Sequence, residues 1–169
     1  MTRPATKIHH GKISLIRPVD VIVLLQDIAR ADPEHVLLAE AQATGIPITN
    51  VDVDTPMLLH GPVGAGRLRT ILAVTDEEIL EAVYWHTTAL ATMGRIAKAV
   101  FLADKMDISK ASRYPYIGRV RELATDNLDR AIVEFLKGDL VRLLEEGKMA
   151  HPASLEALNG LLYQLERSR

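Results

Sequence analysis

Four short stretches of the sequence place a residue that can bind a metal beside an apolar run. They are LLQDIAR with Asp27, MLLHGPVGA with His60, EAVYWHTT with His86 and VFLADKM with Asp104. A carboxylate or imidazole among apolar neighbours must be hydrated, paired or bound to a cation, because burying a bare polar group is costly. Imidazoles and carboxylates suit iron, manganese or zinc, so convergence of the four would make a mononuclear or binuclear metal centre.

Each of these residues alone also has a purely structural explanation. A single histidine beside an apolar helix is more often a packed, hydrogen-bonded histidine than a ligand. Asp104 in ADKM fits a salt bridge on a helix surface, and His60 in LLHGP fits the start of a helix. The set is more specific than its members, because four such stretches in this order are hard to obtain from packing alone.

The elements that must position these residues read as helices. Aromatic residues make up only 4% of the chain, so the core depends on Leu, Ile, Val and Ala, which suit helix packing better than a β-sandwich. Residues 1–18 are polar and irregular, and the apolar run 19–30 fits a buried strand or a buried helix equally well. We expect one all-α domain over residues 1–169, a bundle of about six or seven helices with its helical core in 19–169.

Start and stop signals place the later helices. Pro33 suits a first helical turn, Gly45 a helix end and Thr75 an N-cap. Residues 44–57 and 108–118 are rich in turn formers and are predicted to be loops. The predicted helices span 33–43, 61–72, 75–87, 93–106, 119–148 (with breaks near Thr125 and Gly138 and an end at Gly147) and 151–168.

Composition excludes several classes of function. The formal net charge is −2 and no long basic run is present, so neither nucleic acid nor an anionic membrane is implied as a partner. The absence of cysteine excludes disulfides and thiolate chemistry. No apolar run approaches the roughly 20 residues that span a bilayer, and MTRPATKIHHGK does not read as a secretory signal. A cytoplasmic protein is the simplest expectation.

The order of the chemical stretches carries a family resemblance. LLQDIAR, LLHGPVGA, HTT, LADKM, RYP and ALN, between about Val23 and Leu162, resemble the signature stretches of the HD-domain superfamily. Within it they resemble the YqeK family, the symmetrical diadenosine tetraphosphate hydrolases of bacteria. The resemblance implies an all-α HD-domain fold, a two-iron centre, and hydrolysis of the dinucleotide to two nucleoside diphosphates.

The resemblance also implies roles for the four candidate ligands. Asp27 corresponds to the carboxylate that bridges both metals, His60 and His86 to two further ligands, and Asp104 to the last carboxylate. Gln26 stands where the family has a ligand imidazole, and its carbonyl oxygen is a much weaker donor. One metal therefore keeps two histidines and a carboxylate, whereas the other keeps only its two carboxylates.

The family's first histidine has no recognisable counterpart. His9 and His10 are the only imidazoles before Gln26, and their flanking sequence does not match the family. The early helix that should carry this ligand is not recognisable either. Apolar surface left exposed by its loss would favour a homodimer.

Basic and hydroxyl residues near the candidate ligands could hold a phosphorylated substrate. Arg30, one helical turn after Asp27, and Lys105 are assigned catalytic roles in stabilising charge on phosphoryl oxygens. Arg113 in RYP and Thr87 are assigned to substrate binding, with Thr88 as the alternative hydroxyl. Lys105 directly follows Asp104 and is expected to point elsewhere on a regular helix, whereas Arg113 is expected over the pocket.

Three hypotheses follow for function. The first is a metal-dependent phosphohydrolase that converts diadenosine tetraphosphate to two ADP, with one or two divalent metals, iron before manganese or zinc. The second is a catalytically impaired HD pseudoenzyme that binds a nucleotide or a single metal. The third, a plain helical interaction module, is disfavoured by the retained metal-ligand types. In the first two the partner is a small-molecule nucleotide.

Overall fold

The computed structural model describes residues 22, 25–107 and 113–168 of the 169-residue chain. Residues 1–18, with His9 and His10, and part of the predicted loop 108–118 lie outside the described residues. The described part is all-α, as predicted, and contains eight α-helices, one 3₁₀ helix and no strand. In chain order they are α2 (Glu34–Thr44), α3 (Asn50–Asp54), η1 (Pro56–Leu59), α4 (His60–Thr70), α5 (Glu77–Trp85), α6 (Arg95–Lys105), α7 (Ile117–Asp126), α8 (Leu128–Glu145) and α9 (Pro152–Arg167).

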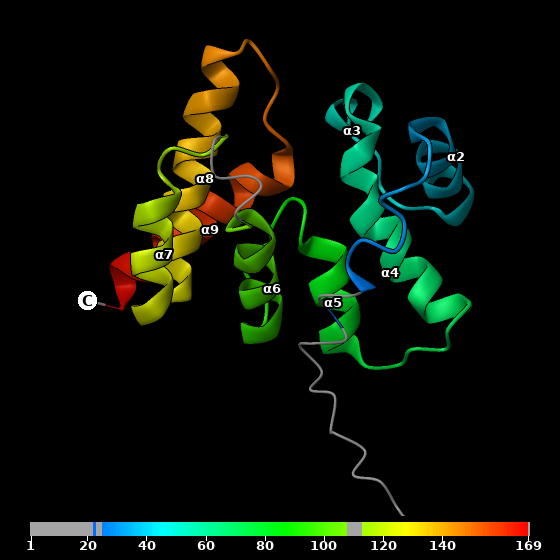
Figure 1. Ribbon diagram of the computed structural model, residues 1–169, viewed down its shortest axis with the longest axis horizontal. Helices are drawn as coiled ribbons and strands as arrows, with labels where there is room; N and C mark the ends of the chain where they lie inside the picture. Colours follow the sequence, from blue (N-terminus) through cyan, green and yellow to red (C-terminus); the bar gives the residue numbers. More distant parts are fainter. Residues whose placement is uncertain (1–21, 23–24, 108–112, 169) are drawn as a thin grey trace, which may run out of the picture.

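The helices form two groups joined by a central pair (Figure 1). Helices α7, α8 and α9 lie together on one side, α2, α3 and α4 lie on the other, and α5 and α6 stand between them. A large apolar core runs from α4 through α9, with Phe101 and Phe135 fully buried at its centre. A smaller core joins α2, η1 and α4 through Leu37, Leu59 and Val63. Both cores include residues of α4, the helix that begins with the candidate ligand His60.

The predicted loop over 44–57 is wrong in part, because it contains helix α3. Thr49 caps this short helix by accepting a hydrogen bond from the Asp52 backbone N–H, while the Asp52 carboxylate accepts one from the Thr49 N–H. This reciprocal capping box satisfies two backbone donors at the helix start. It stabilises a helical turn inside a segment whose composition favours turns.

The predicted break near Thr125 is confirmed, but the one at Gly138 is not. Helix α7 ends at Asp126, and Asn127 caps α8 by accepting a hydrogen bond from the Arg130 N–H. Helix α8 then continues without interruption through Gly138. A Cβ at this position would lie 2.6 Å from the ring of Tyr116, so glycine is needed here for packing against Tyr116 and not for a turn.

Candidate metal centre

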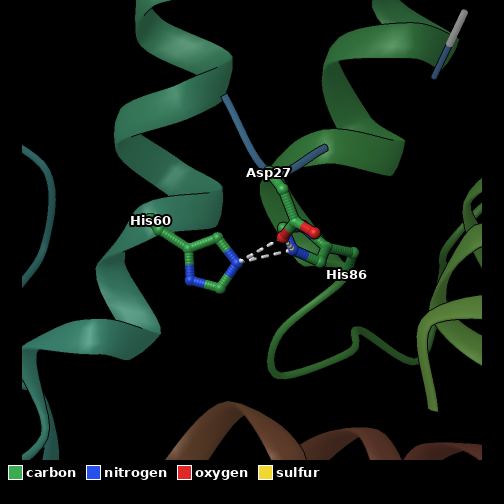
Figure 2. A group of neighbouring side chains, drawn as sticks. All are labelled: Asp27, His60 and His86. Atoms are coloured by element: carbon green, nitrogen blue, oxygen red, sulfur yellow. Dashed lines mark hydrogen bonds and ion pairs between the residues drawn. The ribbon is translucent and has the colours of Figure 1, made fainter. Parts of the chain in front are cut away.

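Three of the four predicted ligands come together at one point (Figure 2). The Nε2 atom of His60 lies 2.8 Å from the Nε2 atom of His86 and 3.3 Å from Asp27 Oδ1. The distance from His86 Nε2 to Asp27 Oδ1 is 3.8 Å. Both histidines are buried, while Asp27 is 39% exposed and opens the group to solvent. These three form the group of potential ligands that the described part of the chain brings within 4.8 Å of one another.

Glycines of α4 explain how the three side chains can approach. His60 is the first residue of α4, and His86 directly follows the last residue of α5. A Cβ on Gly61 would lie only 2.8 Å from the carbonyl oxygen of Tyr84 and 3.3 Å from His86 Nδ1. A Cβ on Gly64 would lie 3.1 Å from Ile28, the neighbour of Asp27. Gly61 thus allows α5 to pack closely against α4, and Gly64, one turn later, allows close packing of the segment that carries Asp27.

Hydrogen bonds to the backbone fix the orientation of both imidazoles. His60 Nδ1 donates to the carbonyl oxygen of Met57, and His86 Nδ1 donates to that of Val83 at 2.7 Å. A carbonyl can only accept, so each neutral ring carries its proton on Nδ1 and a lone pair on Nε2. Metal-ligating histidines commonly have their other ring nitrogen held in this way.

The two lone pairs face each other across 2.8 Å, an arrangement that a positive charge between them would stabilise. Burial lowers the pKa of His86 to about 4, although its bond to Val83 opposes this. Burial likewise lowers the pKa of His60, with Met57 and Asp27 acting in the opposite direction. Both rings are therefore neutral near pH 7, and a proton is a poor candidate for that charge. A divalent cation is the better one.

The donor set fits a first-row divalent metal in size as well as chemistry. The circle through His60 Nε2, His86 Nε2 and Asp27 Oδ1 has a radius of about 1.95 Å, close to the roughly 2.0–2.2 Å of metal–nitrogen and metal–oxygen bonds. Two histidines and one carboxylate with open positions are typical of iron(II) sites, and zinc and manganese accept the same donors. The spacing and the chemistry of these three donors therefore fit one metal ion.

Asp104 lines the same cavity but does not belong to this cluster of three ligands. Its side chain is buried in α6, and its Oδ2 atom is 3.0 Å from the ammonium of Lys105. The positive charge of Lys105 lowers the pKa of His86 and the negative charge of Asp104 raises it, and both residues line the same cavity as His60. The expectation that Lys105 points elsewhere is wrong, since α6 ends at this residue and its side chain turns back toward Asp104 and the Thr87 carbonyl.

The basic residue Arg30 faces the same site as Asp27. Its Nη1 atom lies 3.3 Å from Asp27 Oδ1, across the predicted spacing of three residues. The two side chains are 46% and 39% exposed, so the pair is solvated and contributes little to stability. Its guanidinium remains available to an anionic ligand.

A cavity of about 720 Å³ opens beside the candidate metal centre. Predicted residues on its wall are Arg30, His60, Thr87, Asp104, Lys105 and Arg113. The hydroxyl of Thr87 donates to the Leu58 carbonyl at 3.1 Å, which fixes it in the wall. The Arg113 guanidinium lies 5.6 Å from the Tyr114 ring, and a position on this wall agrees with the expectation for RYP.

Sequence reasoning missed several residues on the same wall. Arg142, paired with Asp139 and Glu146, and Lys148, paired with Glu146, also line the cavity. His151 caps α9, and its Nε2 atom lies 3.3 Å from buried Asp52 of α3. The pattern His-Pro at a helix start was visible in the sequence. Its partner Asp52 was not predictable, because the two residues are 99 positions apart.

Comparisons with known proteins agree with this description. No family model matches. The chain is 26% identical over 146 residues to the symmetrical bis(5'-nucleosyl)-tetraphosphatase of Bacillus subtilis, covering 86% of this chain and 77% of that protein. It is 33% identical over 107 residues to the protein of that name from Halalkalibacterium halodurans and 30% over 112 residues to that from Staphylococcus aureus. These two matches cover 63% and 65% of this chain and only 56% and 57% of those proteins.

A solved structure shares the fold. It is a predicted HD superfamily hydrolase involved in NAD metabolism from Clostridium acetobutylicum, with a TM-score of 0.79 and 22% sequence identity. The match covers 87% of this chain and 77% of that one.

None of the helices described here is long and apolar enough to cross a bilayer.

Proposed function

We propose that the chain is a metal-dependent phosphohydrolase of the HD-domain superfamily, related to the symmetrical bis(5'-nucleosyl)-tetraphosphatases that it resembles in sequence. The proposed substrate is diadenosine tetraphosphate or a similar dinucleoside polyphosphate, which the protein would cleave to two nucleoside diphosphates. One observation carries the proposal. Two oriented imidazole lone pairs and the Asp27 carboxylate converge beside a cavity with basic walls.

The roles of the residues follow from their positions. Asp27, His60 and His86 would hold a divalent metal, which when bound would act as a Lewis acid toward a phosphoryl oxygen and lower the pKa of a water. Iron is the first candidate, with manganese and zinc as alternatives. Arg30, which is 3.3 Å from Asp27, and Lys105, which is 3.0 Å from Asp104, would offset negative charge on the phosphoryl group that is attacked.

The remaining cavity wall fits the rest of a polyphosphate ligand. Arg113 adds a cation to the wall of the cavity, and Thr87 lines the same cavity. A volume of about 720 Å³ lies within the range of small-molecule sites. Tyr114, Leu140 and Leu155 supply apolar surface suited to a nucleobase. We therefore assign Arg113 and Thr87 to substrate binding.

The alternative is an impaired enzyme that binds a nucleotide or one metal without turnover. Gln26 is the observation that favours it. Its side chain is buried, and its Oε1 atom has no hydrogen-bond partner among the described residues. A neutral amide in place of a ligand imidazole weakens any second metal site.

Product analysis separates these two functions. Full-length protein loaded with Fe²⁺, Mn²⁺ or Zn²⁺ is incubated with diadenosine tetraphosphate, and nucleotides are separated by chromatography. ADP as the sole product is expected, and its formation should fall at least 100-fold in H86A. Metal binding and nucleotide binding without any ADP would refute hydrolysis and favour the impaired form. ATP with AMP would refute symmetrical cleavage.

The assembly and the location of the protein stay predictions. A homodimer is tested by light scattering on the full chain, and a cytoplasmic location by fractionation of the source cells.

A further inference from the structure

The turn that follows His86 contains a residue in a backbone conformation that alanine does not favour. Ala89 has a φ of 69°, in the left-handed region that residues other than glycine rarely adopt. Its side chain is fully buried and belongs to the large apolar core. Such a conformation persists only where surrounding contacts hold it. The neighbours of this turn therefore bear on the position of His86.

The first part of α9 supplies contacts of this kind. The Ser154 hydroxyl donates a hydrogen bond of 2.7 Å to the carbonyl oxygen of Thr88, the residue before the strained alanine. The two residues are 66 positions apart in the sequence. Further along α9, a Cβ on Gly160 would lie 2.5 Å from the Cβ of Ala91, so the helix also packs closely against the residues that follow the turn.

The start of α9 also contacts the segment that leads to His60. The Nδ1 atom of His151 accepts a hydrogen bond from the Ala153 N–H, so in the neutral ring Nε2 carries the proton and donates to Asp52 Oδ2 at 3.3 Å. The same carboxylate oxygen accepts from the N–H and the hydroxyl of Thr49 in the α3 capping box. Helix α3 leads through η1 to α4, whose first residue is His60.

We infer that the start of α9 is a clamp that positions the two histidines of the candidate metal centre. Ser154 holds the turn that follows His86, and His151 holds the helix that leads to His60. Ser154 and His151 are thus positioning residues, which act through the two histidines and not as metal ligands. The inference rests on the proposed metal site and does not depend on hydrolysis.

Metal affinity of the full-length protein tests the clamp, with Mn²⁺ alone as the probe and no nucleotide. Free Mn²⁺ is measured by electron paramagnetic resonance during a titration. S154A is expected to weaken Mn²⁺ binding about 10-fold, the lower end of the loss caused by removing groups that orient metal ligands. The matched control is S168A, which removes another serine hydroxyl that donates to a carbonyl, that of Gln164 within α9 at 2.8 Å. Equal Mn²⁺ affinities for the two variants would overturn the inference.

A second substitution separates positioning of the turn from a general loss of stability. Glycine adopts a left-handed φ without strain, so S154A/A89G should keep the shape of the turn and recover Mn²⁺ affinity to within about threefold of the wild type. I132V removes a methyl group from a fully buried side chain of α8 and should lower stability without changing Mn²⁺ affinity. No recovery in S154A/A89G, or a loss of affinity in I132V equal to that in S154A, would contradict the clamp.

H151N tests the other contact of the clamp. Asparagine caps a helix start well, but its side chain is shorter than that of histidine and does not reach Asp52. H151N should therefore keep α9 folded, as measured by circular dichroism, and still weaken Mn²⁺ binding about 10-fold. Wild-type affinity in H151N would exclude His151 as a positioning residue.

The outcomes for the clamp differ from those for the proposed hydrolase. If S154A binds Mn²⁺ more weakly than the wild type and neither protein forms ADP, hydrolysis is refuted and the clamp stands. If the wild type forms ADP and S154A binds Mn²⁺ as tightly as S168A, the clamp is refuted and the hydrolase stands. A wild type that binds no Mn²⁺ would overturn both the metal site and the clamp.

Discussion

Replacement of Gly61 by alanine should push α4 away from α5 and weaken metal binding at the candidate centre. The added Cβ would lie 2.8 Å from the Tyr84 carbonyl oxygen and 3.0 Å from that of Val83. Both neighbours are backbone atoms, so neither can rotate away. Helix α4 must therefore move by a few tenths of an ångström, and His60, the first residue of that helix, moves with it.

The magnitude follows from two opposing effects. Overpacking of a tight helix contact costs about 1–3 kcal/mol. Alanine gains about 0.5–1 kcal/mol over glycine in helix propensity. The net loss in unfolding free energy is about 1–2 kcal/mol, which lowers Tm by about 2–8 °C in a chain of this size. Displacement of a ligand on this scale should weaken Mn²⁺ binding about 10–100-fold.

Gly66 provides the matched control in the same helix. A Cβ there meets nothing within 4 Å, so G66A should keep wild-type Mn²⁺ affinity and gain up to about 1 kcal/mol. Urea unfolding and metal titration of both variants, with metal removed for the unfolding experiment, give the comparison. If G61A bound Mn²⁺ as tightly as G66A does, the argument that this close helix contact sets the spacing of His60 and His86 would be refuted.

Three further perturbations have defined outcomes. In metal-free protein, burial lowers the pKa of His86 to about 4, so the neutral ring contributes about 3 kcal/mol of stability above pH 6.5, which is lost as the pH falls toward 4. The difference between the urea midpoints at pH 7 and pH 4.5 should therefore be smaller in H86L than in the wild type. An equal difference in the two proteins would contradict this. H151A removes the cap of α9 and the partner of Asp52 and should cost about 1–2 kcal/mol in urea unfolding, whereas H35A, on an exposed surface, should cost less than about 0.5. G138A forces a Cβ against the Tyr116 ring and should lower the free energy of unfolding by about 1–3 kcal/mol. In the control G118A the added Cβ meets open space, and equal Tm values for the two variants would refute the packing argument.

The sequence predicts the all-α fold class correctly, and three of the ligands that it predicts lie together in the structure. Helix periodicity and caps are local properties, so the positions of α5 and α9 follow from residues within each helix. Asp27, His60 and His86 could be identified because each interrupts an apolar stretch. Their distances could not, since these depend on how closely α4 and α5 approach at Gly61.

Features that depend on tertiary contacts were missed. The direction of Lys105 follows from the end of α6 and from the Thr87 carbonyl, which comes from a different part of the chain. Glycine is a poor helix former, so the sequence predicts a helix break at Gly138, but the close contact with the Tyr116 ring is the reason for glycine at this position. The pair of His151 with Asp52 joins α9 to α3, and no local pattern reports such a contact.

The orientation of the two imidazoles is the feature that most strongly separates a metal centre from a buried histidine pair. In a purely structural pair, one ring would donate its Nε2 proton to the other, and at least one Nδ1 would then accept a hydrogen bond. Here both Nδ1 atoms face carbonyl oxygens, so neither neutral ring has a proton to place in the 2.8 Å contact between the Nε2 atoms. The backbone of η1 and of α5 thus selects the tautomer that would present both lone pairs to a cation shared with Asp27.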